Sequence, residues 1–416
     1  MSALAPFHVR SFRYQWPADL AASWAFEMET LILGWYILAV TGSVEQLVML
    51  GALVWIGSLF SPLFALAGDR LGIRALLCIT RALYALLAIV LMGLTLSDQL
   101  APWHVFLIAT VIGLVRPSDN LLRNVLIGQT IRPEALMAAL GVSRTTTDTA
   151  RVMGALAGTA GVALVGMGTA YVAVTLLYCT SFVLSLGVAG SSPRARSGSA
   201  GVEAQSLGTV MRDMKQAVSY VWHKPDLLSA FSIALLVNLL AYPFVLGLLP
   251  YVAMDVYGIG QAGLGYLAGA FALGALAGSL GVWTNRLPLR AGRFMLANAA
   301  AWFVCILLFG QTQSVSAGVA LLFVTGLVQS FCLVPLAAVM LRSSSDAMRG
   351  RVMGMRMLAI WGLPLGLLAS GPLIAHLGYP ATTVLYAGLG LVLIVAIGYR
   401  WRGALWQRSA AANAHL

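Results

Sequence analysis

Ionisable side chains stand inside stretches that are otherwise apolar and long enough to cross a bilayer, mostly in the first half of the chain. A charge at this depth is costly, so it is usually paired or lines a polar path. Buried carboxylates can exchange protons, and arginines can grip anionic groups of a ligand. The acids are Glu27, Glu29, Asp119 and Asp148, and the bases are Arg116, Arg123, Arg144 and Arg151.

Helix geometry predicts how these groups divide their roles. A rise of about 1.5 Å per residue puts Arg116 and Arg144 within a few ångströms of one depth, where they can hold a ligand. We expect proton exchange from Glu29 or Asp119, with Glu27 and Asp148 as further candidates. Glu27 and Glu29 lie about 200° apart around a helix, so one must pair sideways. The alternative is that four acids and four arginines only hold spans together, most of all Arg123 and Arg151.

The second half of the chain offers uncharged polar and aromatic side chains in place of the charged ones. Amides and aromatic rings stand beside Pro243, Pro335 and Pro364, which can kink helices and free backbone carbonyls toward a cavity. A charged wall opposite an aromatic and amide-bearing wall suits an amphiphilic ligand with acidic or strongly hydrogen-bonding groups. The predicted ligand-binding residues, besides the two arginines, are Asn120, Asn238, Tyr242, Gln329 and Trp361.

Composition identifies the environment of these groups. The chain of 416 residues is 60% hydrophobic and 9% charged, whereas a soluble protein carries roughly 25% charged residues. We therefore predict an all-α integral membrane protein with twelve transmembrane helices in two pseudo-symmetric six-helix halves. The first apolar segment is long and carries two glutamates, so we expect it to stay in the mature protein. The predicted spans are 17–40, 46–67, 75–96, 102–124, 137–165, 169–190, 227–250, 261–283, 292–312, 315–340, 352–375 and 379–399.

Lysine and arginine predict the orientation, because they concentrate in cytoplasmic loops. They fall almost entirely in alternate connections, while the opposite connections hold acids or histidine. Both termini are therefore predicted to be cytoplasmic, in a multi-pass protein of the inner membrane. The formal charge of +11 indicates contact with anionic lipid rather than nucleic-acid binding. We expect a monomer.

Motifs for other chemistry are missing from the sequence. The four cysteines stand singly in apolar spans, with no histidine at metal-ligand spacing. Gly258, Gly260 and Gly263 match a dinucleotide-binding spacing but follow no predicted strand, and there is no phosphate-binding loop. We predict no metal, no cofactor and no enzymatic activity.

The longest polar stretch divides the chain into 1–190, a linker at 191–226 and 227–416. The linker starts as a flexible Ser, Gly and Arg-rich segment. Apolar residues from Leu207 to Trp222 then recur at helical spacing, which predicts an amphipathic helix on the cytoplasmic surface.

The two halves repeat each other. Asp69-Arg70-x-Gly72-x-Arg74 follows the second span, and Asn285-Arg286-x-Pro288-x-Arg290 follows the eighth at the same spacing. We predict that Asp69, Arg70, Gly72, Arg74, Asn285 and Arg286 form gates at the cytoplasmic side, where the Asp69 charge can accept hydrogen bonds from a helix N-terminus. The repeat implies a pseudo-twofold axis along the membrane normal.

The turn Asp69-Arg70-Leu71-Gly72-Ile73-Arg74 resembles the signature loop of the major facilitator superfamily. Thr41-Gly42-Ser43 and the segment 346–354 resemble the branch that contains macrolide and enterobactin exporters. The resemblance implies alternating access and proton-coupled export of a small organic molecule, with a siderophore-type substrate. Two departures are Ala65, where the family has glycine, and Gly154-Ala155-Leu156-Ala157-Gly158, which lacks the proline of the family's antiporter motif. Other interpretations are a multidrug or macrolide efflux pump, an importer of the same fold, and a non-transporting receptor or scaffold.

Overall fold

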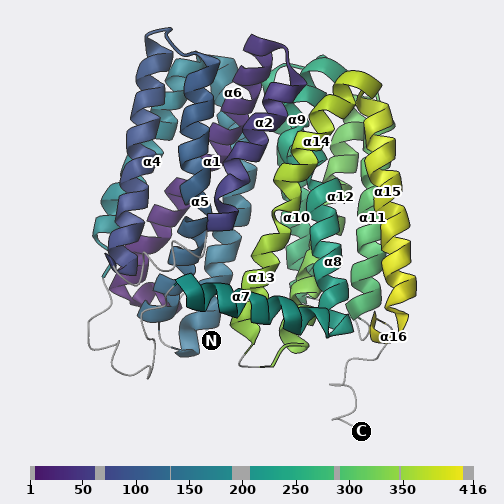
Figure 1. The fold of residues 1–416 in the computed structure, drawn as a ribbon. Coiled ribbons are helices and arrows are strands. Elements are labelled where there is room, and N and C mark those ends of the chain that lie inside the picture. The colour runs from purple at the N-terminus through teal and green to yellow at the C-terminus, as the bar shows by residue number, and fades with distance from the viewer. Residues whose placement is uncertain are drawn as a thin grey trace. The chain divides into compact units, whose positions relative to one another are not determined.

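The computed structural model describes residues 5–60, 71–131, 133–189, 207–284, 291–345 and 348–405. These residues are almost entirely helical and contain no strand (Figure 1). The helices that matter below are α1 (Arg10–Thr41), α2 (Val44–Trp55), α4 (Ile73–Leu96), α5 (Pro102–Thr130), α6 (Pro133–Leu186), α7 (Leu207–Trp222), α8 (Pro225–Leu240), α10 (Gln261–Thr284), α11 (Ala291–Gln311), α12 (Val315–Arg342), α13 (Arg349–Ala359), α14 (Gly362–Leu377) and α15 (Tyr379–Arg400).

The helices account for the twelve predicted spans. In the described part, seven helices are long and apolar enough to cross a membrane, three further apolar helices are shorter, and α1 covers the first predicted span. Helix α6 holds two predicted spans joined at Gly166, whose φ of 82° lies in the left-handed region that glycine tolerates. The prediction of an all-α integral membrane protein with twelve spans in two halves is therefore confirmed.

The described contacts group the chain into two compact units. The first contains residues 1–42, 53–208 and 260–265, and the second contains 43–52, 209–259 and 266–416. The start of α2 belongs to the second unit because it packs on α14, where Leu367 Cδ1 lies 3.1 Å from the position of a Cβ on Gly51. The predicted boundary at residue 190 lies outside the described residues.

In the first unit, α1 packs lengthwise on α6. Small residues allow this close approach: a Cβ on Gly158 would lie 2.8 Å from the Cα of Met28, and one on Gly154 would lie 2.7 Å from the Cβ of Glu27. The glycine spacing noted in the sequence thus brings the backbone of α6 against the part of α1 that carries its glutamates.

In the second unit, two spans depart from regular helix. Pro243 begins a π-helical turn, Pro243–Gly247, and a second such turn runs over Val252–Val256. A break at residues 360–361 separates α13 from α14, and Pro364 lies in the first turn of α14. Pro335, by contrast, lies inside the continuous helix α12. Irregular turns of this kind leave backbone groups available for other partners.

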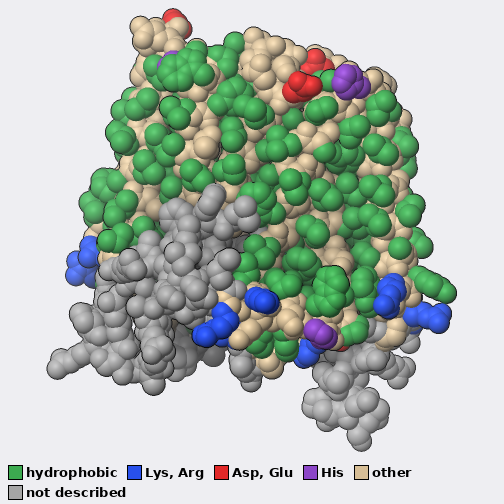
Figure 2. Space-filling model, in the orientation of Figure 1, with side chains coloured by type: hydrophobic (Ala, Val, Ile, Leu, Met, Phe, Trp, Pro, Cys, Tyr) green, Lys and Arg blue, Asp and Glu red, His purple; other side chains and the backbone are tan. Residues whose placement is uncertain are grey.

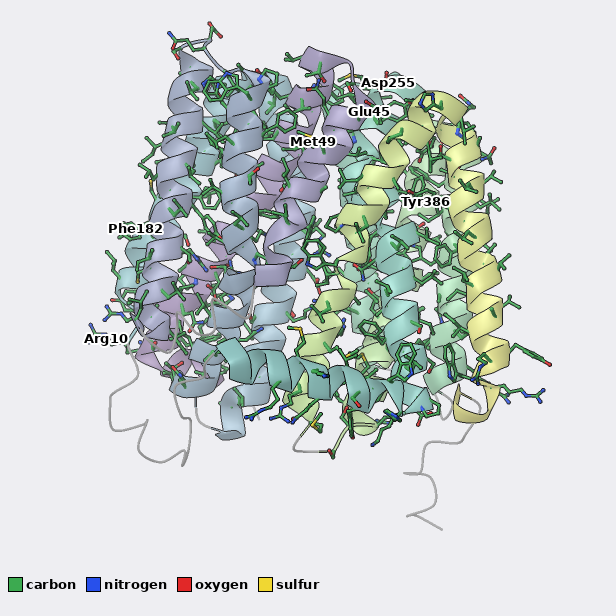
Figure 3. All side chains as sticks on the ribbon, viewed as in Figure 1. Arg10, Glu45, Met49, Phe182, Asp255 and Tyr386 are labelled. Atoms are coloured by element: carbon green, nitrogen blue, oxygen red, sulfur yellow. The ribbon has the colours of Figure 1, made fainter. Side chains whose placement is uncertain are left out.

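Charged side chains mark the two ends of each unit. Within each unit, taken by itself, Lys and Arg lie at one end and Asp and Glu at the other, with apolar side chains between them (Figure 2). Glu45 and Asp255 lie at the acidic end of the second unit, and Arg10 lies at the basic end of the first (Figure 3). This polarity is what a membrane-spanning unit with a lysine- and arginine-rich cytoplasmic side requires.

Candidate functional site

Four buried charges join three helices of the first unit. Asp19 of α1 and Asp119 of α5 alternate with Arg81 of α4 and Arg123 of α5, and their side chains are at most 8% exposed. Arg81 Nη2 lies 2.7 Å from Asp19 Oδ1, and Arg81 Nε lies 2.9 Å from Asp119 Oδ1. Arg123 Nη2 lies 2.6 Å from Asp119 Oδ2, and Arg123 Nε lies 3.4 Å from Asp19 Oδ1. We call these four residues the charge network.

Neutral groups complete the charge network. The guanidinium of Arg81 also donates to the carbonyl oxygen of Ala18 at 2.8 Å and to the Ser181 hydroxyl. Arg123 Nη1 donates to Ser23 Oγ at 2.9 Å, and Gln15 Nε2 donates to the Arg123 carbonyl at 3.1 Å. Two acids and two arginines cancel in charge, which favours one arrangement of their helices, although Arg123 Nε and Gln15 Oε1 have no hydrogen-bond partner among the described residues. Asp119, one of the predicted proton acceptors, is thus held on both carboxylate oxygens by arginines.

Two members of the charge network were not among the candidates from sequence. Asp19 lies in the first predicted span and Arg81 in the third, so both could have been found by counting every charge inside the predicted spans. Arg123, one of the arginines expected to be structural, forms buried ion pairs with Asp19 and Asp119.

Glu29 lies apart from the charge network, on the buried side of α1. Its side chain is almost completely enclosed, the residue being 2% exposed. Its Oε2 accepts a hydrogen bond from Tyr178 OH of α6 at 2.8 Å. The other oxygen, Oε1, is buried and makes no hydrogen bond of full geometry with the described residues, although the Tyr171 hydroxyl also interacts with this carboxylate. Glu29 is therefore a carboxylate enclosed by two tyrosines, with one oxygen held less firmly than the other.

Arg116 of α5 lies near this carboxylate. Its guanidinium stacks on the Phe26 ring of α1. It also interacts electrostatically with Glu29 and with the tyrosines 84 and 178, whose ring centroids are 5.7 Å apart. Arg116 is partly buried and interacts electrostatically with Glu27 and Asp119 as well. The structure therefore places Arg116, a predicted ligand-binding group, near three of the four predicted proton-exchanging carboxylates.

The remaining predicted charges of the first unit form separate pairs. Glu27 Oε1 lies 3.8 Å from Arg151 Nε, with both side chains partly exposed. Arg144 Nε donates to Asp148 Oδ2 at 3.1 Å on the same helix. The Asp148 side chain is 5% exposed, whereas that of Arg144 is 69% exposed. Glu27 therefore pairs sideways while its neighbour two positions on is enclosed.

In the second unit, Gln329 and Tyr242 form a polar aromatic group. Gln329 Nε2 donates to Tyr242 OH at 2.6 Å, and the Tyr242 ring meets Trp302 edge to face with centroids 5.0 Å apart. Gln329 Oε1, Trp302 Nε1 and Trp361 Nε1 are buried without a hydrogen-bond partner among the described residues. Three unpaired polar atoms of this kind can serve a bound ligand. Trp302 was not a candidate from sequence, because a lone tryptophan in an apolar span gives no signal.

Other predicted site residues are less informative. Asn238 donates its amide to the Ala234 carbonyl of its own helix at 2.8 Å. Gly72 precedes α4 with a φ of 87°, and Arg74 Nη2 donates to the Leu186 carbonyl at 2.6 Å. The gate residues Asp69, Arg70, Asn285 and Arg286 lie outside the described residues, as does the side chain of Asn120.

Metal chemistry finds no support in the described part of the chain, where no group of three or more His, Cys, Asp or Glu side chains could hold an ion. A twelve-helix membrane protein in two halves, with ionisable groups enclosed among its helices, is a membrane transporter and not an enzyme. A family model for the Major Facilitator Superfamily matches residues 20–364. The chain belongs to the Major Facilitator Superfamily. No curated protein sequence matches it.

Solved structures with the same fold are distant in sequence. The nucleoside transporter NupG is 15% identical, with a TM-score of 0.70 over 96% of this chain and 100% of that one. A D-xylose-proton symporter is 12% identical, with a TM-score of 0.71 over 93% and 96% of the two chains. The human organic anion transporter MFSD10 is 16% identical, with a TM-score of 0.64 over 93% and 99%. At these identities the likeness shows the fold alone.

Proposed function

We propose that the protein is a secondary active transporter that exports a small organic molecule in exchange for protons. The observation that carries this proposal is the enclosure of Glu29 beside Tyr178 and Arg116, with one carboxylate oxygen held less firmly than the other. Buried carboxylates next to an arginine are costly to place in a membrane and are typical of proton paths. Proton coupling occurs within this fold, as in the D-xylose-proton symporter.

Competition between the substrate and Glu29 for Arg116 would couple substrate export to proton uptake. In the absence of substrate, the Arg116 guanidinium stabilises the ionised form of Glu29. When an anionic or strongly hydrogen-bonding substrate binds Arg116, that stabilisation weakens and Glu29 accepts a proton. Linkage requires the reverse as well, so protonation of Glu29 changes substrate affinity by the same factor. Asp119 is the weaker candidate because arginines hold both of its oxygens, and Glu27 and Asp148 have ion-pair partners of their own.

The substrate we propose is amphiphilic and of the siderophore type. Arg116 and, once it leaves Asp148, Arg144 would bind its anionic or hydroxyl groups. In the second unit, taken by itself, the unpaired atoms of Gln329 and Trp361 are suited to hydrogen-bond a substrate of this type. The resemblance of residues 346–354 to macrolide and enterobactin exporters supports export. Macrolide or multidrug efflux and import by the same fold are the competing assignments. Further contacts are proposed for Asn120, Asn238 and Tyr242.

The proposed setting is the inner membrane, with both termini cytoplasmic and the protein acting as a monomer. The lysine and arginine distribution supports this orientation. Asp69, Arg70, Gly72, Arg74, Asn285 and Arg286 are proposed to gate the cytoplasmic side during alternating access. A receptor or scaffold would not require an ionisable carboxylate such as Glu29 enclosed among buried tyrosines.

Transport by purified protein in proteoliposomes tests the coupling. With an imposed pH gradient, Glu29→Gln should abolish uphill transport of a catecholate siderophore such as enterobactin while downhill exchange persists. Glu27→Gln is the matched control, because it removes a carboxylate two positions away on the same helix, and it should retain pH-driven transport. If Glu29→Gln follows the pH gradient as the unmodified protein does, Glu29 is not the coupling group.

A further inference from the structure

Helix α7, which precedes the first helix of the second six-helix half, has three distinct sides. Ala217 and Val221, four residues apart, are buried at 2% and 0% exposure. Residues four apart lie on one face of a helix, so these two mark the side that packs on the second unit. In Figure 1, α7 runs crosswise to α8 at the basic end of that unit.

The second side of α7 is bonded to the segment before α13. Tyr220 OH accepts from the Ser345 backbone N–H at 3.1 Å and from Lys224 Nζ at 2.7 Å. Lys224 Nζ also donates to the Ser343 carbonyl at 3.1 Å. Arg351 Nη1 of α13 donates to Gln216 Oε1 at 3.0 Å. Gln216, Tyr220 and Lys224 therefore tie one edge of α7 to Ser343, Ser345 and Arg351, and we call this set of bonds the clasp.

The third side combines an apolar edge with a basic strip. Val218 is 41% exposed and Trp222 is 68% exposed. At 100° per residue they lie on the edge roughly opposite Gln216 and Tyr220. Arg212 and Lys215 are both exposed and lie on the side of α7 away from Ala217, with Lys215 next to the apolar edge and Arg212 one step further round, toward Gln216.

An exposed tryptophan and valine flanked by cations match the interface of a bilayer. Amphipathic helices lie in the membrane plane with aromatic residues at the acyl boundary and Lys or Arg at the headgroups, and tryptophan is enriched at this depth. The position of Trp222 also suits a bilayer interface. Helix α7 ends at Trp222 and α8 begins at Pro225, so the exposed tryptophan lies beside the start of a transmembrane span. A soluble acidic partner would match the two cations but not the apolar edge.

We propose that α7 binds anionic phospholipid through Trp222, Val218, Lys215 and Arg212, and that the clasp passes this binding to the segment that begins α13. Lipid held on one edge of the helix fixes α7 at the membrane surface, and the opposite edge then holds Ser343, Ser345 and Arg351. Neutral lipid would leave the apolar contact but not the ionic one. The composition of the membrane would thereby set how firmly the start of α13 is held.

Lipid binding can be measured on the full chain in nanodiscs of phosphatidylcholine, with or without phosphatidylglycerol, followed by native mass spectrometry of the retained lipid. Each basic residue near an anionic surface contributes about fivefold in affinity, so Arg212→Gln with Lys215→Gln should lower phosphatidylglycerol affinity by about 25-fold. The matched control is the same double variant with phosphatidylcholine alone, whose retention should not change because its headgroup carries no net charge. An unchanged phosphatidylglycerol affinity in the α7 variant, or an equal loss of phosphatidylcholine, would overturn the proposal.

A separate measurement tests whether lipid binding at α7 stabilises α13 through the clasp. Hydrogen exchange of residues 348–359 should slow when phosphatidylglycerol is added to the unmodified protein. Tyr220→Phe removes the phenol oxygen of the clasp and leaves the lipid-facing edge intact, so it should bind phosphatidylglycerol normally while this protection is lost. If Tyr220→Phe keeps the lipid-dependent protection, α7 binds lipid without passing it to α13, and that half of the proposal is wrong.

Discussion

Arg81 of α4 and Asp19 of α1 form an ion pair of 2.7 Å in which the arginine side chain is completely buried. The same guanidinium bonds Asp119, a backbone carbonyl and a serine hydroxyl. Four helices of the first unit, α1, α4, α5 and α6, therefore meet at one arginine. Such an arrangement is sensitive to the loss of any one partner, because a buried charge left unpaired is far more costly than a surface charge.

Arg81→Gln should destabilise the protein by about 3 to 5 kcal/mol, because it leaves two buried carboxylates with one arginine. Thermal unfolding of the purified protein in detergent measures the effect. Asp19→Asn combined with Arg81→Gln restores charge balance, so the double variant should lose less than the two single losses together. The matched control is Arg10→Gln, which removes an exposed arginine of α1 and should change stability by less than about 1 kcal/mol. Equal losses at Arg81 and Arg10 would contradict this account.

Much of the fold follows from sequence because its cause is local. A bilayer forces about 20 apolar residues per span, so the twelve segments could be recognised one by one. The joint of two spans at Gly166 and the break at residues 360–361 could not, since both depend on how neighbouring helices pack.

The sequence predicted which residues belong to the candidate site better than it predicted which of them contact one another. Sequence gives depth and helix face, which separated Glu27 from Glu29. It does not give the partner helix, so the enclosure of Glu29 by Tyr178 could not be predicted. The pairing of Arg144 with Asp148 lies within one helix, at the i,i+4 spacing that the sequence does show, and was missed for no such reason. Trp302 became a candidate only through its contact with Tyr242.

Gly158→Ala tests the packing of α1 on α6. A Cβ at this position would lie 2.8 Å from the Cα of Met28, so the helices must separate, at a cost of about 1 to 3 kcal/mol. Gly161→Ala on the same helix is the control, because its nearest atom would be the Ala170 Cβ at 3.8 Å. There the better helix propensity of alanine should raise stability by up to about 1 kcal/mol. Thermal unfolding of both variants decides the point, and a neutral Gly158→Ala would mean that the two helices are less closely packed than described.

Tyr220 should titrate below an ordinary tyrosine. The Lys224 ammonium, and then the hydrogen bonds from Ser345, lower the pKa of Tyr220 to about 8. Since the pKa is depressed in the folded protein, the clasp gains stability as the pH rises from about 8 toward the ordinary value near 10, and this contribution is lost as the pH falls through about 8. The absorbance difference at the tyrosinate band between the unmodified protein and Tyr220→Phe isolates this one phenol. Its midpoint should lie near 8 and move upward in Lys224→Gln, and a midpoint near 10 in the unmodified protein would exclude the ionic clasp.

Arg116→Ala should weaken substrate binding itself rather than the coupling to protons. A charge-assisted hydrogen bond contributes about 1.5 to 3 kcal/mol, so the dissociation constant for a catecholate siderophore should rise by roughly 10- to 150-fold. Arg116→Lys should rescue little of this loss, because an ammonium lacks the planar fork that stacks on Phe26 and grips two acceptors at once. Arg144→Ala is the informative comparison, since its guanidinium is already paired with Asp148 and its loss should weaken binding by less than Arg116→Ala does. Isothermal titration calorimetry on purified protein measures all three. If Arg144→Ala costs more affinity than Arg116→Ala, the substrate's anionic group is bound on α6, and the competition between substrate and Glu29 for Arg116 cannot be the coupling step.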